Sequence, residues 1–135
     1  MSPRAVVEAW VAAFNRADVP ALAALYAPDA VNHQMAYGAL QGRDEIAAMF
    51  AMEFGRATMV CVIENLVEQG EWAVLEWSDP LGLRGCGWFR IADGLIQFQR
   101  GYFDRLQFYE AQGISPEQAV ATEAALKSAI EAGRT

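Results

Sequence analysis

Cysteine and histidine are scarce in this sequence of 135 residues, which has two cysteines and one histidine. A protein metal site needs several His, Cys or carboxylate ligands at short spacing, and no such group occurs, so we expect no metal. A glycine-rich phosphate loop and a Ser-His-Asp arrangement are also missing, and we therefore expect no cofactor. Cys61 and Cys86 both fall in segments of strand pattern. They are interpreted as buried free thiols, because the chain is too poor in cysteine for a disulfide framework.

Basic residues are outnumbered, with 10 Lys and Arg against 17 Asp and Glu and a net charge of −7. Phosphate binding needs clustered Lys and Arg, so the charge argues against nucleic acid and against an anionic membrane surface as partners. No run approaches the roughly 20 apolar residues of a membrane span. The start, Met1-Ser2-Pro3-Arg4, leads into an amphipathic helix without the apolar core of a signal peptide. We expect a cytoplasmic protein with no membrane contact.

Apolar residues are abundant, at 54% of the chain, which is enough for one domain with its own core over residues 1–135. Their spacing predicts helices over 3–17, 20–27, 43–54, 105–112 and 115–132, and long strands over 58–67, 72–78, 84–92 and 95–104. A short strand over 30–35 and a loop over 36–42 are predicted before the third helix. Residues 115–133 are interpreted as a C-terminal helical extension.

Helices kept apart from an antiparallel run of strands are typical of the α+β class. Asp93-Gly94 is the strongest hairpin signal and supports the antiparallel run. A strongly curved sheet with helices packed on its concave face leaves a cavity that side chains need not fill. The sequence therefore predicts a cone-shaped α+β domain with an internal pocket.

Five stretches carry a family likeness. They are Val6–Asp18 (VVEAWVAAFNRAD), Leu25–Val31 (LYAPDAV), Gly42–Ile46 (GRDEI), Asp93–Ile96 (DGLI) and Arg100–Asp104 (RGYFD). They resemble the nuclear transport factor 2-like superfamily and its SnoaL-like domains, and the likeness extends over nearly all of residues 3–114. The resemblance implies a cystatin-like cone. It does not fix the function, because the superfamily includes ketosteroid isomerases, limonene-epoxide hydrolases, polyketide cyclases, dehydratases and proteins that only bind.

Some residues that the best-known reactions of the superfamily need are replaced in this sequence. Where ketosteroid isomerases have a tyrosine and a carboxylate base, the resemblance places Trp10 and Gln34, with His33 beside the latter. An indole and an amide cannot do those jobs. Where the epoxide hydrolases position water with Tyr and Asn, the resemblance places Asn32 and Gln34, which can still orient water. Gly101 replaces one acid of the epoxide set.

Alternation along the last strand puts every second side chain on one face. On that basis Ile96, Phe98, Arg100, Tyr102 and Asp104 share a face that we expect to line the cavity. Arg100, Tyr102 and Asp104 are the candidate catalytic residues. A single acid in an apolar pocket, as the resemblance to polyketide cyclases implies, is chemistry that Asp104 can supply alone. The alternative is an Arg–Asp ion pair that fixes the turn into the next helix.

The candidate ligand-binding residues are Asn32, Gln34, Trp10, Tyr26 and Glu76. Trp10 and Tyr26 are core residues first and also suit an apolar pocket wall. Glu76 lies in an otherwise apolar stretch. If its side chain points inward, burial would raise its pKa and make it a candidate acid or base; if it points outward, it is an ordinary solvated charge.

These features predict a small-molecule pocket protein of the SnoaL-like type, with acid/base activity of the isomerase, cyclase or hydrolase kind on an apolar substrate. The alternative is a non-catalytic ligand-binding or dimerisation module. A fully packed interior would favour that alternative, and a large cavity with a buried carboxylate of raised pKa would count against it. Gln97 and Gln99 suit the outer face of the sheet, which in this superfamily often forms a dimer contact, so a homodimer is expected.

Overall fold

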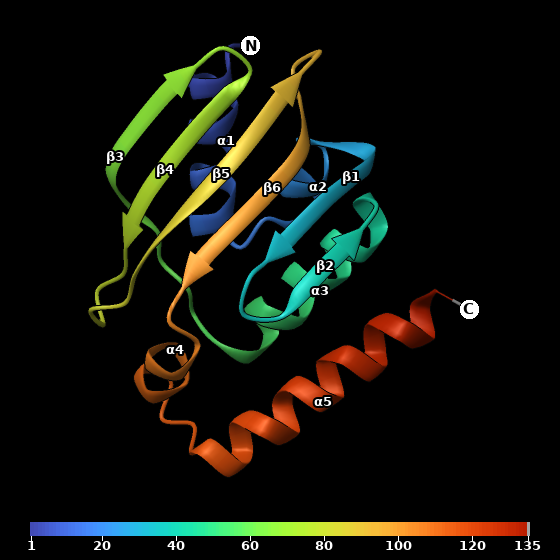
Figure 1. Cartoon of the computed structure of the whole chain (residues 1–135), viewed down its shortest axis with the longest axis vertical. Coiled ribbons are helices and arrows are strands. Elements are labelled where there is room, and N and C mark those ends of the chain that lie inside the picture. The colour runs from blue at the N-terminus through green and yellow to red at the C-terminus, as the bar shows by residue number, and fades with distance from the viewer. Residues whose placement is uncertain (135) are drawn as a thin grey trace.

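The computed structural model describes residues 1–134 as an α+β fold (Figure 1). Its helices are α1 (Pro3–Asn15), α2 (Val19–Ala23), α3 (Arg43–Arg56), α4 (Arg105–Ala111) and α5 (Pro116–Gly133). Its strands are β1 (Tyr26–Gln34), β2 (Gly38–Gln41), β3 (Val62–Gln69), β4 (Trp72–Ser78), β5 (Arg84–Ala92) and β6 (Leu95–Phe103). The predicted fold class is confirmed.

The strands form one curved sheet in the order β2-β1-β6-β5-β4-β3. Strands β3 to β6 make the predicted antiparallel meander, whereas β1 runs parallel to β6. Helices α1 and α3 cover the same face of the sheet, which is the far face in Figure 1. The parallel pairing sets Asn32 of β1 opposite Gln99 of β6. Two polar side chains far apart in the sequence therefore meet on the sheet.

Helix α1 buries the face that its three- and four-residue spacing predicts. Ser2 caps it by accepting a hydrogen bond from the Ala5 amide at 3.1 Å, and Pro3 occupies the first turn. The apolar side chains Val6, Val7, Trp10 and Val11 are buried against the sheet. Burial of this stripe is what holds a helix of this length in place, because isolated short helices are marginal in water.

Two boundaries around β1 differ from the sequence prediction. The strand begins at Tyr26 rather than at residue 30, and its pairing with β6 is irregular between Tyr26 and Val31. Pro28 falls in that irregular stretch, where a missing amide N–H breaks no ladder bond. Residues 38–41, predicted as loop, form the edge strand β2, which pairs only with β1. A four-residue edge strand needs little intrinsic strand preference, so the pattern did not reveal it.

A second, smaller apolar cluster joins α4 and α5 to the end of the sheet. It contains the buried side chains of Leu83, Phe108, Tyr109 and Ala119. Ser115 and Gln118 form a capping box at the start of α5. Among residues 1–134, no helix is long and apolar enough to cross a membrane.

Both cysteines are free thiols. Cys61 is buried, and burial raises the pKa of its thiol to about 12. Cys86 is only half-buried, which corrects the expectation that both thiols are enclosed. A thiol with a raised pKa carries little thiolate, so Cys61 is a packing residue rather than a nucleophile.

Candidate functional site

A cavity of about 400 Å³ lies between the helices and the inner face of the sheet. This volume falls in the roughly 300–1,000 Å³ range of small-molecule sites. Most of the wall is apolar, and its larger side chains include Phe14, Met49, Phe50, Leu75, Phe89 and Phe108. Trp10 stacks on Phe14 at 5.0 Å and meets Phe89 edge-on at 5.4 Å, so these rings brace one another around the space.

A chain of hydrogen bonds crosses the inner side of the sheet. The Trp10 indole N–H donates to the Tyr26 hydroxyl at 2.9 Å, and that hydroxyl donates to the side-chain oxygen of Gln99. Tyr26 is completely buried, and the burial raises the pKa of its hydroxyl far above the ordinary value. Tyr26 therefore stays neutral and fixes Trp10 and Gln99, which both line the cavity. The expectation that Gln99 lies on the outer face is wrong.

Two amides from β1 form the polar part of the cavity wall. The Gln34 side-chain NH₂ donates to the Asn32 side-chain oxygen at 2.6 Å. Gly101 on β6 leaves the room that the Gln34 amide occupies, because a Cβ at this position would collide with it. Asn32 is fully buried and its own NH₂ has no hydrogen-bond partner within residues 1–134. That amide is therefore free to donate to a molecule in the cavity.

Glu53 supplies a carboxylate to the cavity wall from the last turns of α3. The residue is only 6% exposed. Its carboxylate accepts a hydrogen bond from the Arg56 guanidinium at 2.7 Å. Burial raises the pKa of Glu53, and the positive charge of Arg56 opposes that rise. A raised pKa brings a carboxyl group closer to the range in which it can exchange protons near neutral pH.

Tyr37 lies beside this carboxylate, in the turn between β1 and β2. Its ring packs edge-on against Phe103 at 5.7 Å. Its buried hydroxyl lies beside that of Tyr109 but makes no hydrogen bond of good geometry within residues 1–134. Burial raises the pKa of Tyr37, and the negative charge of Glu53 raises it further. The hydroxyl is therefore a neutral donor on the cavity wall, next to the one carboxylate of the described chain whose pKa burial raises.

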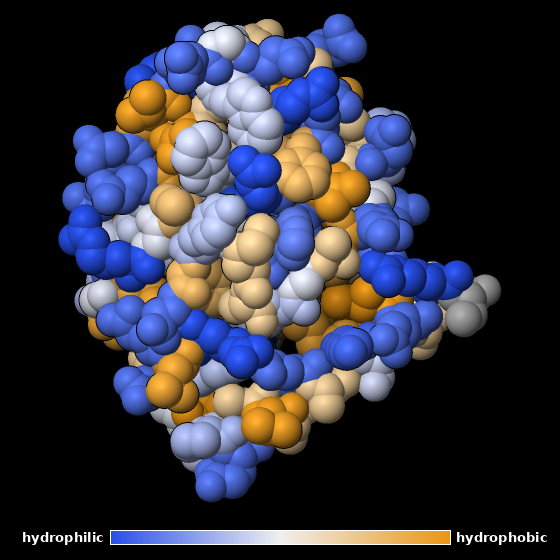
Figure 2. All heavy atoms as spheres, in the orientation of Figure 1, coloured by the Kyte–Doolittle hydropathy of each residue, from blue (hydrophilic) through white to orange (hydrophobic). Residues whose placement is uncertain are grey.

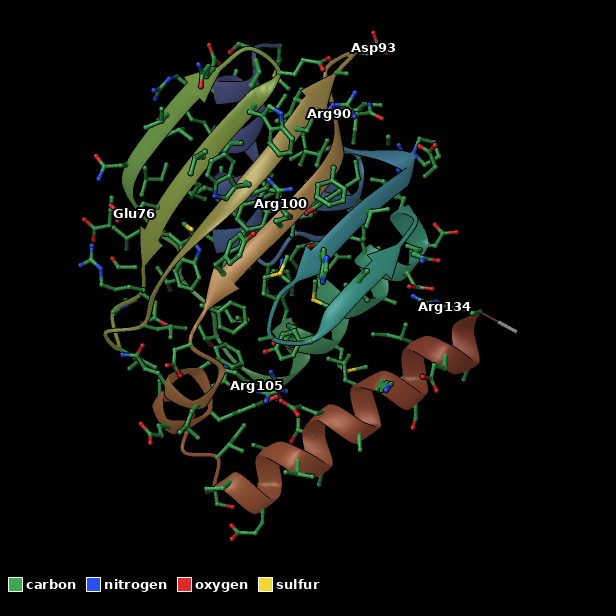
Figure 3. All side chains as sticks on the ribbon, viewed as in Figure 1. Glu76, Arg90, Asp93, Arg100, Arg105 and Arg134 are labelled. Atoms are coloured by element: carbon green, nitrogen blue, oxygen red, sulfur yellow. The ribbon has the colours of Figure 1, made fainter. Side chains whose placement is uncertain are left out.

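Helix α4 and the residues that follow it close one end of the cavity. Phe108, Ala111 and Gln112 of the α4 region contribute to its wall. Glu123 of α5 ties the two helices together, because it forms an ion pair with Arg105 at 2.9 Å (Figure 3 labels Arg105) and lies within 3.5 Å of the Tyr109 hydroxyl.

The predicted polar cluster of the last strand lies largely on the wrong face for the cavity. Arg100 packs against Trp72, Trp88 and Phe98 on the opposite face of the sheet, at 5.1 to 5.8 Å from the ring centres (Figure 3). Tyr102 touches the cavity wall but is 42% exposed.

The reason is a bulge in β6. Ile96 pairs with Ile91, and Phe98 pairs with Arg90. Ile91 and Arg90 are adjacent in β5, whereas Gln97 stands between Ile96 and Phe98, so Gln97 is an extra residue in β6. Ile96 is fully buried on the inner side, and the extra residue turns Phe98 and Arg100 to the outer side. Regular alternation from Ile96 predicts an inward position for Phe98, Arg100 and Tyr102. That prediction is wrong for Phe98 and Arg100, because it does not include the extra residue.

Asp104 and Glu76 also lie away from the cavity wall. Asp104 is exposed and caps α4, where its carboxylate accepts the Gln107 amide N–H at 2.8 Å. It fixes the turn into the helix, although through a cap and not through the ion pair with Arg100 that was the alternative. Glu76 is exposed on the outer face and accepts a hydrogen bond from Asn65 at 2.7 Å. Glu76 is therefore an ordinary solvated charge rather than a buried acid or base.

Glu53 and Tyr37 are the residues that sequence reasoning missed. Ile46, Met49, Phe50 and Glu53 follow one another at helical steps, and all four are buried in α3. That spacing was a usable signal for Glu53. Tyr37 lay in a segment predicted as loop, and no periodic pattern could have shown which way its ring points.

Comparison with known proteins identifies the family. A family model described as a SnoaL-like domain matches residues 7–98. Among curated proteins, no sequence matches this chain at a significant level.

Solved structures share the fold over most of the chain. A Catenulispora acidiphila protein with a ketosteroid isomerase-like fold, crystallised with trimethylamine, is 20% identical with a TM-score of 0.75, covering 85% of this chain and 96% of its own. An M. tuberculosis LEH-like epoxide hydrolase is 24% identical with a TM-score of 0.71, covering 82% and 88%. A putative polyketide cyclase from Sinorhizobium meliloti is 22% identical with a TM-score of 0.66, covering 73% and 94%. These low identities show the fold alone. With the family model spanning more than half of its sequence, the chain belongs to the SnoaL-like domain family.

Proposed function

We propose that the protein binds a neutral, apolar small molecule in its cavity and acts on it by acid/base chemistry, with Glu53 as the proton-transfer group. The observation that carries this proposal is a buried carboxylate of raised pKa on the wall of a largely apolar cavity. Asn32, Gln34 and Trp10 are the proposed ligand-binding residues, because each lines the same space. Reactions of the isomerase, cyclase and hydrolase kind all need such a proton transfer.

Hydrogen–deuterium exchange on a model ketone tests the catalytic part without knowledge of the natural substrate. The probe is 2-acetylnaphthalene in D₂O, whose methyl protons are followed by NMR. The Glu53 carboxylate takes a proton from the methyl carbon, an enolate forms, and deuterium returns to that carbon. We expect the protein to accelerate the exchange, and Glu53→Gln to reduce that acceleration by roughly a hundredfold or more.

Glu117→Gln is the matched control, because Glu117 is exposed on α5 and is not part of the cavity wall. It should exchange the probe as the unmodified protein does. A probe that binds but exchanges no faster than in buffer would remove the catalytic role and leave a binding protein.

We also propose that two copies pair through the outer face of the sheet. Val67, Val74, Trp88 and Arg100 form one row of cross-strand neighbours on this face. White to orange spheres gather over the strands there (Figure 2). Trp88 is 38% exposed, so a large aromatic side chain contributes to this surface, as is typical of an interaction site. None of the ion pairs within residues 1–134 includes Arg100, so its charge is available to an acid of a second copy.

A further inference from the structure

Unpaired polar atoms are concentrated in the cavity. Four buried side-chain atoms have no hydrogen-bond partner within the described chain, and they belong to Asn32, Tyr37, Gln112 and Arg100. The first three residues line the cavity, and only Arg100 lies outside it. More than about nine in ten buried polar groups in proteins are paired. Three exceptions around one space indicate groups that are kept for a ligand.

Asn32 is the best defined of these groups. Its side-chain oxygen is already occupied by the Gln34 amide at 2.6 Å, and Gln34 is seated in the space that Gly101 leaves open. With the Asn32 oxygen accepting from Gln34, the NH₂ is the end of the Asn32 amide that has no partner within residues 1–134. The free end is a donor, so its partner on the ligand must be an acceptor.

The charge of the cavity wall decides which kind of acceptor it is. Arg56 is the only cation among the lining residues of the described chain, and Glu53 neutralises it at 2.7 Å. Asp79, at another part of the wall, uses its carboxylate to accept the amides of Leu81 and Leu83. A ligand carboxylate would therefore lose its hydration without gaining a free counter-ion, which is costly. A neutral oxygen loses much less.

We propose that Asn32 determines the ligand class, by donating its side-chain N–H to a neutral carbonyl oxygen on an otherwise apolar ligand. The inference rests on the proposed function only for the presence of a ligand in the cavity, and it does not need Glu53 to transfer a proton. The other two groups, Tyr37 and Gln112, are then available to further polar substituents of the same molecule.

Three naphthalenes of similar size test this proposal by isothermal titration calorimetry. The probes are 2-acetylnaphthalene, which carries a neutral carbonyl, 2-ethylnaphthalene, which lacks it, and 2-naphthoate, which is an anion. A hydrogen bond to a buried, otherwise unpaired donor corresponds to roughly a tenfold change in affinity. We expect the ketone to bind about tenfold more tightly than the hydrocarbon, and the naphthoate to bind more weakly than the ketone.

Asn32→Asp is the first variant, since its ionised carboxylate keeps an acceptor for Gln34 and has no donor, although it adds a buried negative charge. Asn32→Leu is the second, and it avoids a buried charge if the first variant fails to fold. Both should bring the ketone-to-hydrocarbon ratio close to one. Asn65→Asp is the matched control on the outer face, where Asn65 contacts Glu76, and it should leave the ratio unchanged.

Each result distinguishes the two proposals. Equal binding of ketone and hydrocarbon, or a ketone preference that survives both Asn32 variants, overturns the role of Asn32 while the pocket stands. Tightest binding by the naphthoate overturns the neutral ligand class. If no probe binds, both the ligand class and the proposed pocket function fall. A ketone preference without catalysed deuterium exchange keeps the ligand class and removes only the catalytic role of Glu53. If neither Asn32 variant folds, the order of the three probes on the unmodified protein still decides whether the ligand class is correct.

Discussion

At the scale of single residues, Glu53 is subject to two opposing influences. It is almost completely buried, and it is held by one arginine on the next helical turn. Burial favours the neutral acid while Arg56 favours the carboxylate, and burial is the larger effect. The side chain therefore costs the fold some stability whenever it is ionised. Proteins retain such groups where the perturbed proton affinity has a use.

This cost predicts a specific dependence of stability on pH. In the unfolded chain Glu53 titrates near its ordinary pKa of 4.5, whereas in the folded protein its pKa is higher. The folded state therefore binds this proton more tightly, and the contribution of Glu53 to stability is fully present below pH 4.5 and declines as the pH rises through the folded pKa. Glu53→Gln should remove that decline and gain stability relative to the unmodified protein as the pH rises.

Urea unfolding at a series of pH values from acid to neutral measures the difference. Glu117→Gln, which changes an exposed carboxylate in the same way, should follow the unmodified protein closely. A constant difference between Glu53→Gln and the unmodified protein at every pH would mean that the folded pKa of Glu53 is not raised.

At the scale of elements, the bulge in β6 decides which face of the strand meets the cavity. Side chains alternate between the two faces along most of the strand, as predicted, but one extra residue after Ile96 reverses which side chains face the cavity. Bulges of this kind have no strong mark in a single sequence when the extra residue is not glycine. The end of the strand shows the opposite situation, because Asp104 directly precedes α4, where capping residues are common, and this signal favours a cap over catalysis.

The cap gives a prediction that separates the two roles of Asp104. Asp104→Ala removes the acceptor for the Gln107 amide and should lower the free energy of unfolding by about 1 kcal/mol, while Asp104→Asn caps equally well and should leave stability near its original value. Neither change should slow deuterium exchange on 2-acetylnaphthalene in the folded protein. Chemical denaturation and the exchange measurement check the two parts. Loss of exchange in the stable Asp104→Asn protein would restore Asp104 as a catalytic residue.

At the scale of the whole molecule, the fold was predictable and the site only partly so. Amphipathic spacing in residues 3–15, the Asp93-Gly94 hairpin and the resemblance of the remaining segments were enough for the architecture, because each depends on local pattern. Asn32, Gln34 and Trp10 line the cavity, and their role in ligand binding stays a prediction. The pattern did not reveal Glu53, because a charged residue is normally exposed even when its neighbours on the same helical face are apolar.

The sheet also predicts how copies of the chain associate. Trp88→Ala should weaken the proposed dimer roughly thirtyfold, because a central interface tryptophan is commonly worth about 2 kcal/mol or more. Val120→Ala, which trims an exposed apolar side chain on α5, is the control and should not change the association. Sedimentation equilibrium over a range of concentrations provides the measurement. A monomer for the unmodified protein at all concentrations would rule out the sheet interface.

Helix α4, which contributes to the cavity wall, lies beyond the residues that the family model matches. The family model ends at residue 98, whereas Phe108, Ala111 and Gln112 complete the wall. An ion pair between Arg134 and Glu45 at 2.7 Å ties the end of α5 back to α3 (Figure 3 labels Arg134). Residues 105–114 thus form one end of the cavity, and α5 is held against them and against α3 by ion pairs. We expect that replacing this segment by those of relatives would leave Asn32 and Glu53 in place and change the length of molecule that the cavity accepts.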